Sequence, residues 1–394
     1  MNKEIKSVQA WPQFSEEEIM ISSEILRSGK VNYWTGDHGK LFEEEFSEYL
    51  GVNYSIALAN GTLAIDLALK CLGVGPGDEV IVTPRSFIAS VSCVVNAGAV
   101  PVFADVDPLS GNIDPSYISD VITSKTKAII CVHLAGWPCN MDEIMDLATR
   151  HELFVIEDCA QAHGASYKGK KVGSLGHIAA WSFCQDKIMS TGGEGGMVTT
   201  DDKDLWSKMW SYKDHGKNYD SVYSQSTLPG FKWLHDSFGS NFRMTEFQSA
   251  IGRIQLKKLD DWSKIRNNNA NFMKKLCDSF DNVLKTPICD EDYHHAYYKF
   301  YTYIDIDKLK DGVTRDSLIE ILNLHGVPAF SGSCPEIYLE NAFKNTSFAP
   351  DQRLPQARLL GETSLMFPVH PTLLKEDLEY ISKGLKNAFN EVIK

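Results

Sequence analysis

One lysine of this chain stands where an amine could do covalent chemistry. Lys187 lies between the apolar run Ala179–Cys184 and the glycine-rich stretch Ser190–Gly196. Asp158 ends another apolar run earlier in the chain, Leu153–Asp158. A lysine that forms a Schiff base, with a carboxylate that holds a pyridinium nitrogen, is what pyridoxal phosphate chemistry requires. The pair therefore predicts pyridoxal 5'-phosphate (PLP) as the cofactor.

Each of these two residues also has an ordinary explanation. A lysine beside a glycine turn is usually an exposed surface residue, and an aspartate after a strand can cap a helix. Both Lys187 and Asp158, however, lie at the ends of predicted strands, where open α/β sheets build their binding sites. The glycines that follow Lys187 would also let the backbone approach a flat cofactor closely.

Several other positions could hold such a cofactor. Backbone N–H groups of Gly61 and Thr62, at the start of a predicted helix, could bind its phosphate, and Ser182 could add a hydroxyl. Gln161 follows Asp158 by three residues, within reach of the phenolic oxygen of the ring, and Phe87 could stack on the ring face. Helix capping, a surface amide and plain core packing explain the same residues without a ligand.

Alternating strands and helices must position these residues. Between residues 55 and 202, short runs rich in Val, Ile and Ala alternate with helix-like stretches, which predicts right-handed crossovers and a mainly parallel sheet covered on both faces. The expected strands are Ser55–Asn60, Glu79–Pro84, Val100–Asp107, Lys127–Gly136, Leu153–Asp158 and Ala179–Cys184, with Gly195–Asp202 returning beside the strand before Lys187. The expected helices are Thr62–Leu72, Phe87–Ala97 and Met141–His151.

The pattern changes after Gly239. A long helical stretch, Arg243–Phe280, is expected to bridge two domains, and Lys217–His235 is expected to be a long functional loop. Beyond it, the pattern predicts a strand at Tyr297–Ile306 and helices at Thr314–His325 and Leu374–Ile393. We therefore predict an α/β fold with a large PLP-binding domain, including an N-terminal segment, in residues 1–255. A smaller C-terminal α+β domain is expected in residues 256–394.

Composition narrows the class of protein. A chain of 394 residues that is 43% apolar and 23% charged is typical of a globular protein with two domains. A formal net charge of −13 disfavours a nucleic-acid partner. The sequence has no apolar run long enough to span a membrane, and Met1–Lys6 lacks the apolar core of a signal peptide. Nine scattered cysteines without a paired spacing indicate reduced thiols, and we expect a cytoplasmic protein.

Signatures of other enzyme classes are absent from the sequence, which has no GxxxxGK[ST], GxGxxG after a strand, HExxH or GxSxG. The segments that are present, taken together, resemble the DegT/StrS-type sugar aminotransferases, which are fold type I PLP enzymes. The resemblance covers nearly the whole chain. It includes Asn60–Ala64, Asp78–Val82, Gly98–Asp107, Glu157–Gly164, Ser182–Lys187, Gly193–Gly196 and Gly239–Glu246.

The resemblance implies a role for each candidate residue. Lys187 would carry the cofactor, with Asp158 at the ring nitrogen, Gln161 at the phenolic oxygen, Phe87 over the ring, and Gly61, Thr62 and Ser182 around the phosphate. Members of the family are homodimers with shared active sites, so Asn241 would reach the phosphate of the neighbouring subunit. Dehydratases of the family carry histidine in place of the lysine, and Lys187 therefore favours amino transfer, with glutamate as donor.

The acceptor is a carbonyl sugar, and two kinds are implied. The whole sequence is similar to the transaminases that make 8-amino-3,8-dideoxy-manno-octulosonate for lipopolysaccharide, which favours the C8 aldehyde of 8-oxo-3-deoxy-manno-octulosonate. A nucleotide-linked keto sugar is the alternative. Arg85 departs from the usual pattern of the family and could bind a substrate carboxylate, unless it forms a surface or interface ion pair. Two further functions compatible with the resemblance are a PLP-dependent dehydratase and a non-catalytic regulator.

Overall fold

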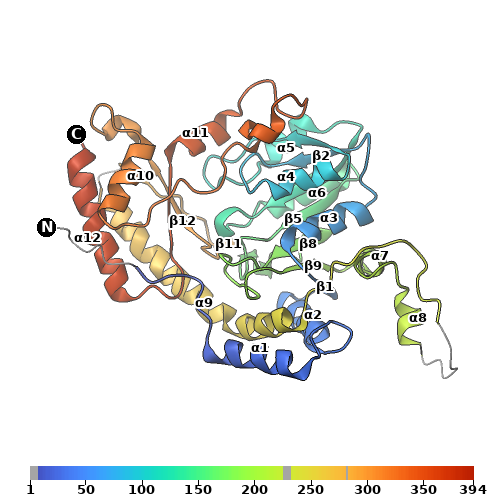
Figure 1. The fold of residues 1–394 in the computed structure, drawn as a ribbon. Helices are drawn as coiled ribbons and strands as arrows, with labels where there is room; N and C mark the ends of the chain where they lie inside the picture. The colour runs from blue at the N-terminus through green and yellow to red at the C-terminus, as the bar shows by residue number, and fades with distance from the viewer. Residues whose placement is uncertain (1–7, 225–231, 281–282) are drawn as a thin grey trace.

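The computed structural model describes residues 8–224, 232–280 and 283–394 (Figure 1). Two predictions therefore fall partly or wholly outside the described residues, namely the N-terminal Met1–Lys6 and the middle of the loop Lys217–His235. The described part of that loop contains a short helix, α8 (Tyr219–Tyr223). No helix in the described ranges is both long and apolar enough to cross a membrane.

A seven-stranded sheet forms the centre of the larger part of the molecule. Its order is β1-β9-β8-β5-β4-β2-β3, and the last five strands in this order run parallel to one another. The strand β9 is antiparallel to both of its neighbours, which confirms the predicted return beside the strand before Lys187. The strands are β1 (Tyr54–Leu58), β2 (Glu79–Val82), β3 (Val100–Phe103), β4 (Thr126–Val132), β5 (Phe154–Asp158), β8 (Ile178–Ser182) and β9 (Gly196–Thr200).

Helices cover both faces of this sheet. Successive side chains of a strand point to opposite faces, and in these strands both sets are apolar and buried. Val82 and Ile130 pack in a core with one set of helices, whereas Ile81 and Ile129 pack with another. The first set is α3 (Gly61–Cys71), α4 (Ala89–Asn96) and α7 (Lys203–Lys213). The second set is α5 (Pro115–Val121) and α6 (Met141–Arg150). The near-continuous apolar runs of the sequence therefore mark strands that are buried on both sides.

The long helix α9 (Glu246–Asp278) connects the large sheet to the C-terminal part of the chain (Figure 1). Its 33 residues span about 50 Å. Near its end it packs against a three-stranded antiparallel sheet of order β10-β12-β13. This part contains β10 (Leu284–Lys285), β12 (Phe300–Ile304), β13 (Ser364–Phe367), α10 (Arg315–Leu324), α11 (Pro355–Thr363) and α12 (Lys375–Val392). A small third sheet joins β6 (Ser166–Tyr167), β7 (Lys170–Lys171) and β11 (Tyr293–His294).

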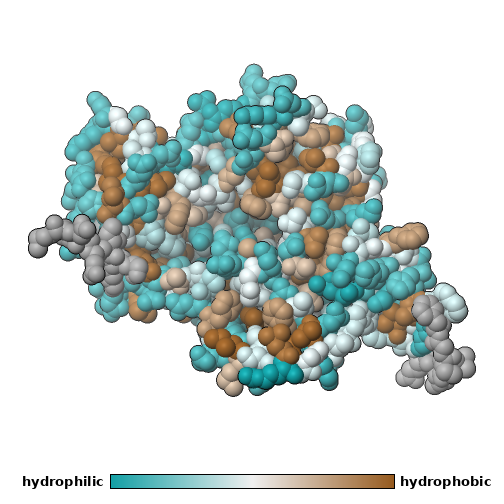
Figure 2. Space-filling view, viewed as in Figure 1, coloured by the Kyte–Doolittle hydropathy of each residue, from teal (hydrophilic) through white to brown (hydrophobic). Residues whose placement is uncertain are grey.

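Two N-terminal helices, α1 (Glu16–Ser28) and α2 (His38–Leu50), pack along the first half of α9. The Glu246 carboxylate accepts the backbone N–H groups of His38 and Gly39, so the start of α9 holds the start of α2. Apolar side chains of α1 remain exposed, among them Met20 and Leu26, and hydrophobic residues gather over this helix in Figure 2.

Candidate active site

Lys187 lies on the loop between β8 and β9, close to the carboxyl end of β8. Its backbone N–H donates to the Cys184 carbonyl at 3.0 Å, and its own carbonyl accepts the indole N–H of Trp11 at 2.8 Å. The return to β9 passes through Gly192 and Gly193 at φ of 85° and 122°, conformations that favour glycine. The Lys187 side chain is 15% exposed. The backbone of Lys187 is therefore held by hydrogen bonds at its N–H and at its carbonyl, while its amine still has access to solvent.

Asp158 ends β5, the strand next to β8 in the sheet. Its carboxylate is buried and accepts two hydrogen bonds, from the Ser90 hydroxyl at 2.8 Å and from the Ala160 backbone N–H at 3.1 Å. Ser90 lies on α4, and its hydroxyl is also 3.0 Å from that of Ser86. Asp158 is thus fixed in one orientation by its partners. Neither serine was expected at the site, although the Ser-x-x-x-Ser spacing at a helix start could have indicated them.

A buried ion pair supports the end of β5 from behind. The Glu157 carboxylate lies 2.9 Å from His133 Nε2 and accepts the backbone N–H groups of Gly173, Leu175 and Gly176. Burial alone would raise the pKa of Glu157, but the hydrogen bond and charge of His133 and the backbone donors lower it overall. These partners hold Glu157, the residue before Asp158, and thereby the end of β5.

Gln161 is buried just beyond Asp158, not exposed as a surface amide would be. Its side-chain oxygen accepts the backbone N–H of Ala135 at 2.8 Å. Ala135 has a φ of 57°, and its carbonyl accepts the N–H of Tyr298 at 2.8 Å. Gln161 is therefore held by a tight turn after β4 that also contacts the chain leading into β12.

The start of α3 offers a cradle for a phosphate. Asn60 caps the helix by accepting the Leu63 N–H, and Gly61 faces Ser182 at the end of β8. A Cβ atom at position 61 would lie 2.6 Å from the Ser182 Cβ, so only glycine permits this close approach. Thr62, the second residue of the helix, is exposed, and the Ser182 hydroxyl oxygen would lie 3.1 Å from a Cβ at position 61. Backbone N–H groups at a helix start favour anions, so these residues fit the phosphate of PLP.

Phe87 and Asn241 are both exposed in the single chain. Phe87 lies two residues before α4 begins at Ala89, which corrects the expectation that it begins the helix. Asn241 pairs with Asp214 next to the end of β1, where Phe242 accepts the N–H of Ala59. The stacking role of Phe87 and the reach of Asn241 into a neighbouring subunit stay predictions.

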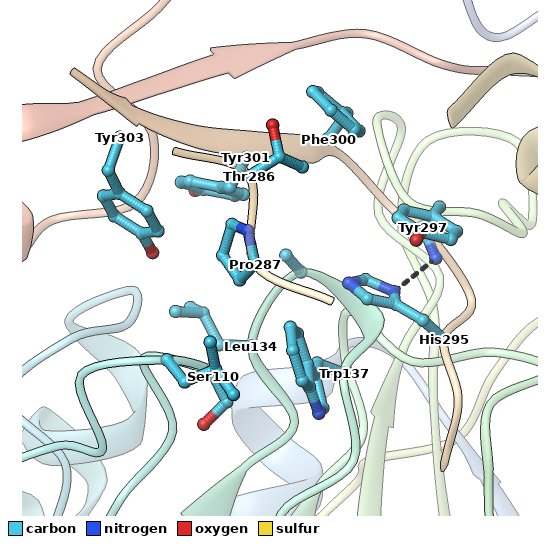
Figure 3. A pocket seen from close by; sticks show the side chains of 12 residues that line it. Ser110, Leu134, Trp137, Thr286, Pro287, His295, Tyr297, Phe300, Tyr301 and Tyr303 are labelled. Atoms are coloured by element: carbon cyan, nitrogen blue, oxygen red, sulfur yellow. Dashed lines mark hydrogen bonds between the residues drawn. The ribbon is translucent and has the colours of Figure 1, made fainter. Parts of the chain in front are cut away.

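Arg85 is buried, so the structure contradicts the interpretation of this residue as a surface ion pair. Its guanidinium lies 5.3 Å and 5.5 Å from the ring centres of Tyr301 and Tyr303, and Nη1 donates to the Tyr303 hydroxyl at 3.0 Å. Nε has no hydrogen-bond partner among the described residues. The two tyrosines line an aromatic pocket together with Trp137, and Figure 3 shows these rings around it. Arg85 is not itself among the lining residues; it contacts two of them, Tyr301 and Tyr303, and keeps one N–H group without a partner among the described residues.

Three residues that the sequence did not single out surround Lys187. The Lys187 ammonium lies 5.1 Å from the ring centre of Tyr298 and 4.0 Å from the Asp186 carboxylate, and the Tyr298 hydroxyl donates to Asp186. His163 is buried between Trp181 and Phe183. Burial, with the charges of Lys187 and Arg266, lowers the pKa of His163 to about 3, so this ring is neutral.

The arrangement combines an amine, a buried carboxylate at the end of the neighbouring strand and an anion cradle, all at one edge of the sheet. Such a set can hold a phosphorylated pyridine ring, keep its nitrogen protonated and move a proton at the amine. The structure thus brings Lys187, Asp158, Gln161, Gly61 and Ser182 to the same edge of the sheet, and the role of each toward the cofactor stays a prediction.

Comparison with known proteins agrees with this chemistry. The family model described as the DegT/DnrJ/EryC1/StrS aminotransferase family matches residues 12–386. GDP-perosamine synthase from Escherichia coli O157:H7 is 36% identical over 364 residues, covering 90% of this chain and 91% of the relative. The crystal structure of an aminotransferase from Psychrobacter cryohalolentis is 55% identical, with a TM-score of 0.96 over 98% of this chain and 99% of that chain.

A further solved structure bears on the cofactor. Spr1654 from Streptococcus pneumoniae, in its PLP form, is 25% identical with a TM-score of 0.85, over 96% of this chain and 97% of that one. The fold is the mainly parallel α/β fold of the type I PLP aminotransferases. The chain belongs to the DegT/DnrJ/EryC1/StrS aminotransferase family and is a PLP-dependent sugar aminotransferase.

Proposed function

We propose that this enzyme takes an amino group from glutamate and places it on the carbonyl carbon of a nucleotide-linked keto sugar. One observation carries the proposal, which is the convergence of Lys187, Asp158 and the Gly61–Ser182 cradle at one edge of the large sheet. The similarity to GDP-perosamine synthase supports a nucleotide-linked acceptor. Glutamate as the donor rests on the resemblance of the sequence to its family.

Each residue of the site has a distinct task in this reaction. Bound PLP supplies an electron sink next to the reacting nitrogen. In the donor half-reaction, Nζ of Lys187 takes the proton from the carbon that carries the amino group. In the acceptor half-reaction, the same Nζ delivers a proton to the carbon that receives the amino group. Asp158, oriented by Ser90 and Ala160, keeps a negative charge beside the ring nitrogen. Gly61 and Ser182 hold the phosphate end in place, which fixes the ring relative to Lys187.

A second acceptor is favoured by Arg85. Its guanidinium is buried beside the aromatic pocket, and its Nε has no partner among the described residues. A guanidinium matches the two oxygens of a carboxylate, and a free sugar acid would supply one. The second candidate is therefore the C8 aldehyde of 8-oxo-3-deoxy-manno-octulosonate. Its product, 8-amino-3,8-dideoxy-manno-octulosonate, would serve lipopolysaccharide biosynthesis.

The acceptors can be separated with ¹⁵N-labelled glutamate. PLP-loaded enzyme is incubated with nucleotide-linked 4-keto and 3-keto sugars or with the octulosonate aldehyde, and the products are weighed by mass spectrometry. ¹⁵N in a nucleotide sugar supports the first acceptor, whereas ¹⁵N in the octulosonate alone supports the second. Loss of oxygen from the sugar without gain of ¹⁵N would contradict amino transfer and indicate a dehydratase.

We also propose that the enzyme is a homodimer with shared active sites. Asn241 is exposed on a segment that lies beside the cofactor edge of its own sheet, so a second subunit that docks on this face could receive it. Lys187→Ala and Asn241→Ala subunits, each inactive alone, should regain activity when mixed, because one of the hybrid sites is intact. Full activity of a purified monomer would contradict the proposal, as would inactivity after verified subunit exchange.

A further inference from the structure

A second cavity, of about 400 Å³, lies beside the Lys187 loop. It shares no lining residue with the aromatic pocket of Figure 3. Its wall combines the N-terminal segment at Trp11, the Lys187 loop at Asp186, and the C-terminal part of the chain at Lys299, Phe330 and His370. The cavity therefore lies where a substrate bound at Lys187 could extend between the two parts of the molecule.

The cavity and its floor carry more positive than negative charge. Lys299 lines the cavity, and no carboxylate among the described residues lies within ion-pair distance of it. Behind Trp11 and next to His370, Arg266 is buried, and its Nε and Nη2 have no hydrogen-bond partner in the described part of the chain. Among the residues that the structure describes, Asp186 is the one carboxylate in the cavity wall, and it already accepts the Tyr298 hydroxyl.

Burial disfavours the charged forms of Arg266 and Lys299. Burial lowers the pKa of Arg266 to about 9, and burial likewise lowers the pKa of Lys299, although the charge of Asp186 opposes the shift. A protein keeps such a group when a ligand supplies the missing charge. The amino donor of the proposed reaction brings one such anion, its side-chain carboxylate, to the Lys187 site in every catalytic cycle.

The geometry relates this charge to the reacting amine. The Nζ atoms of Lys187 and Lys299 lie 5.1 Å and 4.9 Å from the ring centre of the same residue, Tyr298. The sum of these distances limits the separation of the two nitrogens to 10.0 Å. An extended glutamate spans roughly 5–6 Å from its amine to its distal carboxylate, and an N–H···O contact adds about 2.9 Å. A glutamate that reacts at Lys187 would thus cover about 8–9 Å of a separation that is at most 10.0 Å, which places Lys299 at the distance where its side-chain carboxylate would arrive.

We propose that Lys299, with Arg266 behind it, binds the side-chain carboxylate of the amino donor and so selects a dicarboxylic amino acid such as glutamate. The proposal rests on the proposed function, since it names the donor subsite of the same active site. An amino acid of similar length that ends in a methyl group, such as norvaline, would leave the Lys299 ammonium desolvated without a partner. The site therefore discriminates by charge.

The test compares Lys299→Met with Lys257→Met in the PLP-loaded enzyme. Methionine keeps an unbranched apolar stem and removes the charge, and Lys257 is an exposed residue of α9 that serves as the matched control. Glutarate, which has both carboxylates of glutamate but no amine, is titrated by calorimetry as a ligand that cannot react. We expect its affinity to fall at least tenfold in Lys299→Met and to stay unchanged in Lys257→Met.

The donor half-reaction, followed by the cofactor absorbance, gives a second readout. Lys299→Met should raise the KM for glutamate at least tenfold, leave the KM for norvaline unchanged, and leave the KM for the acceptor unchanged; Lys299→Arg should restore part of the loss. Equal glutarate affinity in both methionine variants would overturn the proposal, as would a rise in the acceptor KM alone. If wild-type enzyme transferred no nitrogen from glutamate, the proposed function would fail, and glutarate binding would still decide the subsite.

Discussion

The two sides of the Lys187 site satisfy their polar groups differently. At the edge of the large sheet, Asp158 accepts two hydrogen bonds and Gln161 accepts one from the Ala135 backbone. Where the large part meets the C-terminal part at Tyr297–Tyr303, the buried Arg85 and Arg266 retain N–H groups that have no partner among the described residues. Both sides are buried, so solvent does not explain the difference.

The difference separates groups that are positioned from groups that bind. A buried polar group with all its partners is fixed, which suits a residue that must hold a cofactor in one orientation. A buried cation without a partner has a free energy that an arriving anion can lower. We therefore expect substitutions at the sheet edge to reduce the rate of the chemical step, and substitutions of the cations to change the KM for substrates.

The largest effect is expected from Lys187→Ala, which removes the proton-transferring amine. Both half-reactions should become undetectable, because general acid–base catalysis alone contributes about 10²–10⁴-fold and the cofactor also loses its covalent attachment. The rate is measured by the cofactor absorbance in single-turnover experiments. Normal turnover in the variant would show that Lys187 is not the reacting amine. The comparison between the sheet edge and the cation sites would then lose its basis.

The next effect is expected from Asp158→Asn, which retains the shape but removes the charge beside the ring nitrogen. A charged hydrogen bond is worth about 1.5–3 kcal/mol, or roughly 10–150-fold in rate, and loss of ring protonation should add to this. Ser90→Ala removes only one partner of Asp158 and should cost about 2–10-fold for a loss of 0.5–1.5 kcal/mol. A larger loss in Ser90→Ala than in Asp158→Asn would show that Ser90 does not act only through Asp158.

The sheet edge could be predicted from the sequence because it depends on local signals. A strand, a turn and a helix start are each short, and the carboxyl ends of parallel strands meet at one edge. This is why the sequence could indicate that Lys187, Asp158, Gly61 and Ser182 lie near one another, whereas their roles toward the cofactor stay predictions. The start of α4 was displaced by two residues, because Phe87 continues the apolar pattern although the helix begins at Ala89.

The cation sites could not be predicted, because they depend on contacts between distant segments. Arg85 meets Tyr303 across more than two hundred residues of chain, and no periodicity in either segment indicates that contact. The same holds for Lys299, which faces Asp186 and Trp11 only after the N-terminal segment and β12 have packed against the Lys187 loop. A lone arginine or lysine in a sequence is usually a surface residue, so burial became apparent only in the fold.

A smaller effect, confined to one substrate, is expected from Arg85→Lys. Lysine keeps the charge but cannot reproduce the planar fork, so an acidic sugar acceptor should bind at least tenfold more weakly while the glutamate half-reaction stays intact. Arg358→Lys, an exposed position on α11, is the control. If Arg85 only joins the two parts of the molecule through Tyr301 and Tyr303, the variant will lose stability to urea without a change in the acceptor KM.

The smallest effect on activity, and a sharp test of the comparison, is expected at His163. Neither of its ring nitrogens has a partner in the described structure, yet it lines neither of the two cavities described above. Its folded pKa of about 3 lies below the unfolded value near 6.5, so the unfolded chain binds the extra proton and stability is lost as the pH falls from 6.5 toward 3. For cofactor-free protein, His163 should contribute about 2 kcal/mol to the loss of unfolding free energy between pH 7 and pH 5. Urea titrations at the two pH values should show that His163→Leu removes this contribution, whereas His151→Leu, at an exposed position, does not. If the loss of unfolding free energy were equal in wild type and His163→Leu, His163 would take up its proton within the folded protein. A buried group without a partner would then mark neither a binding site nor a cost in stability.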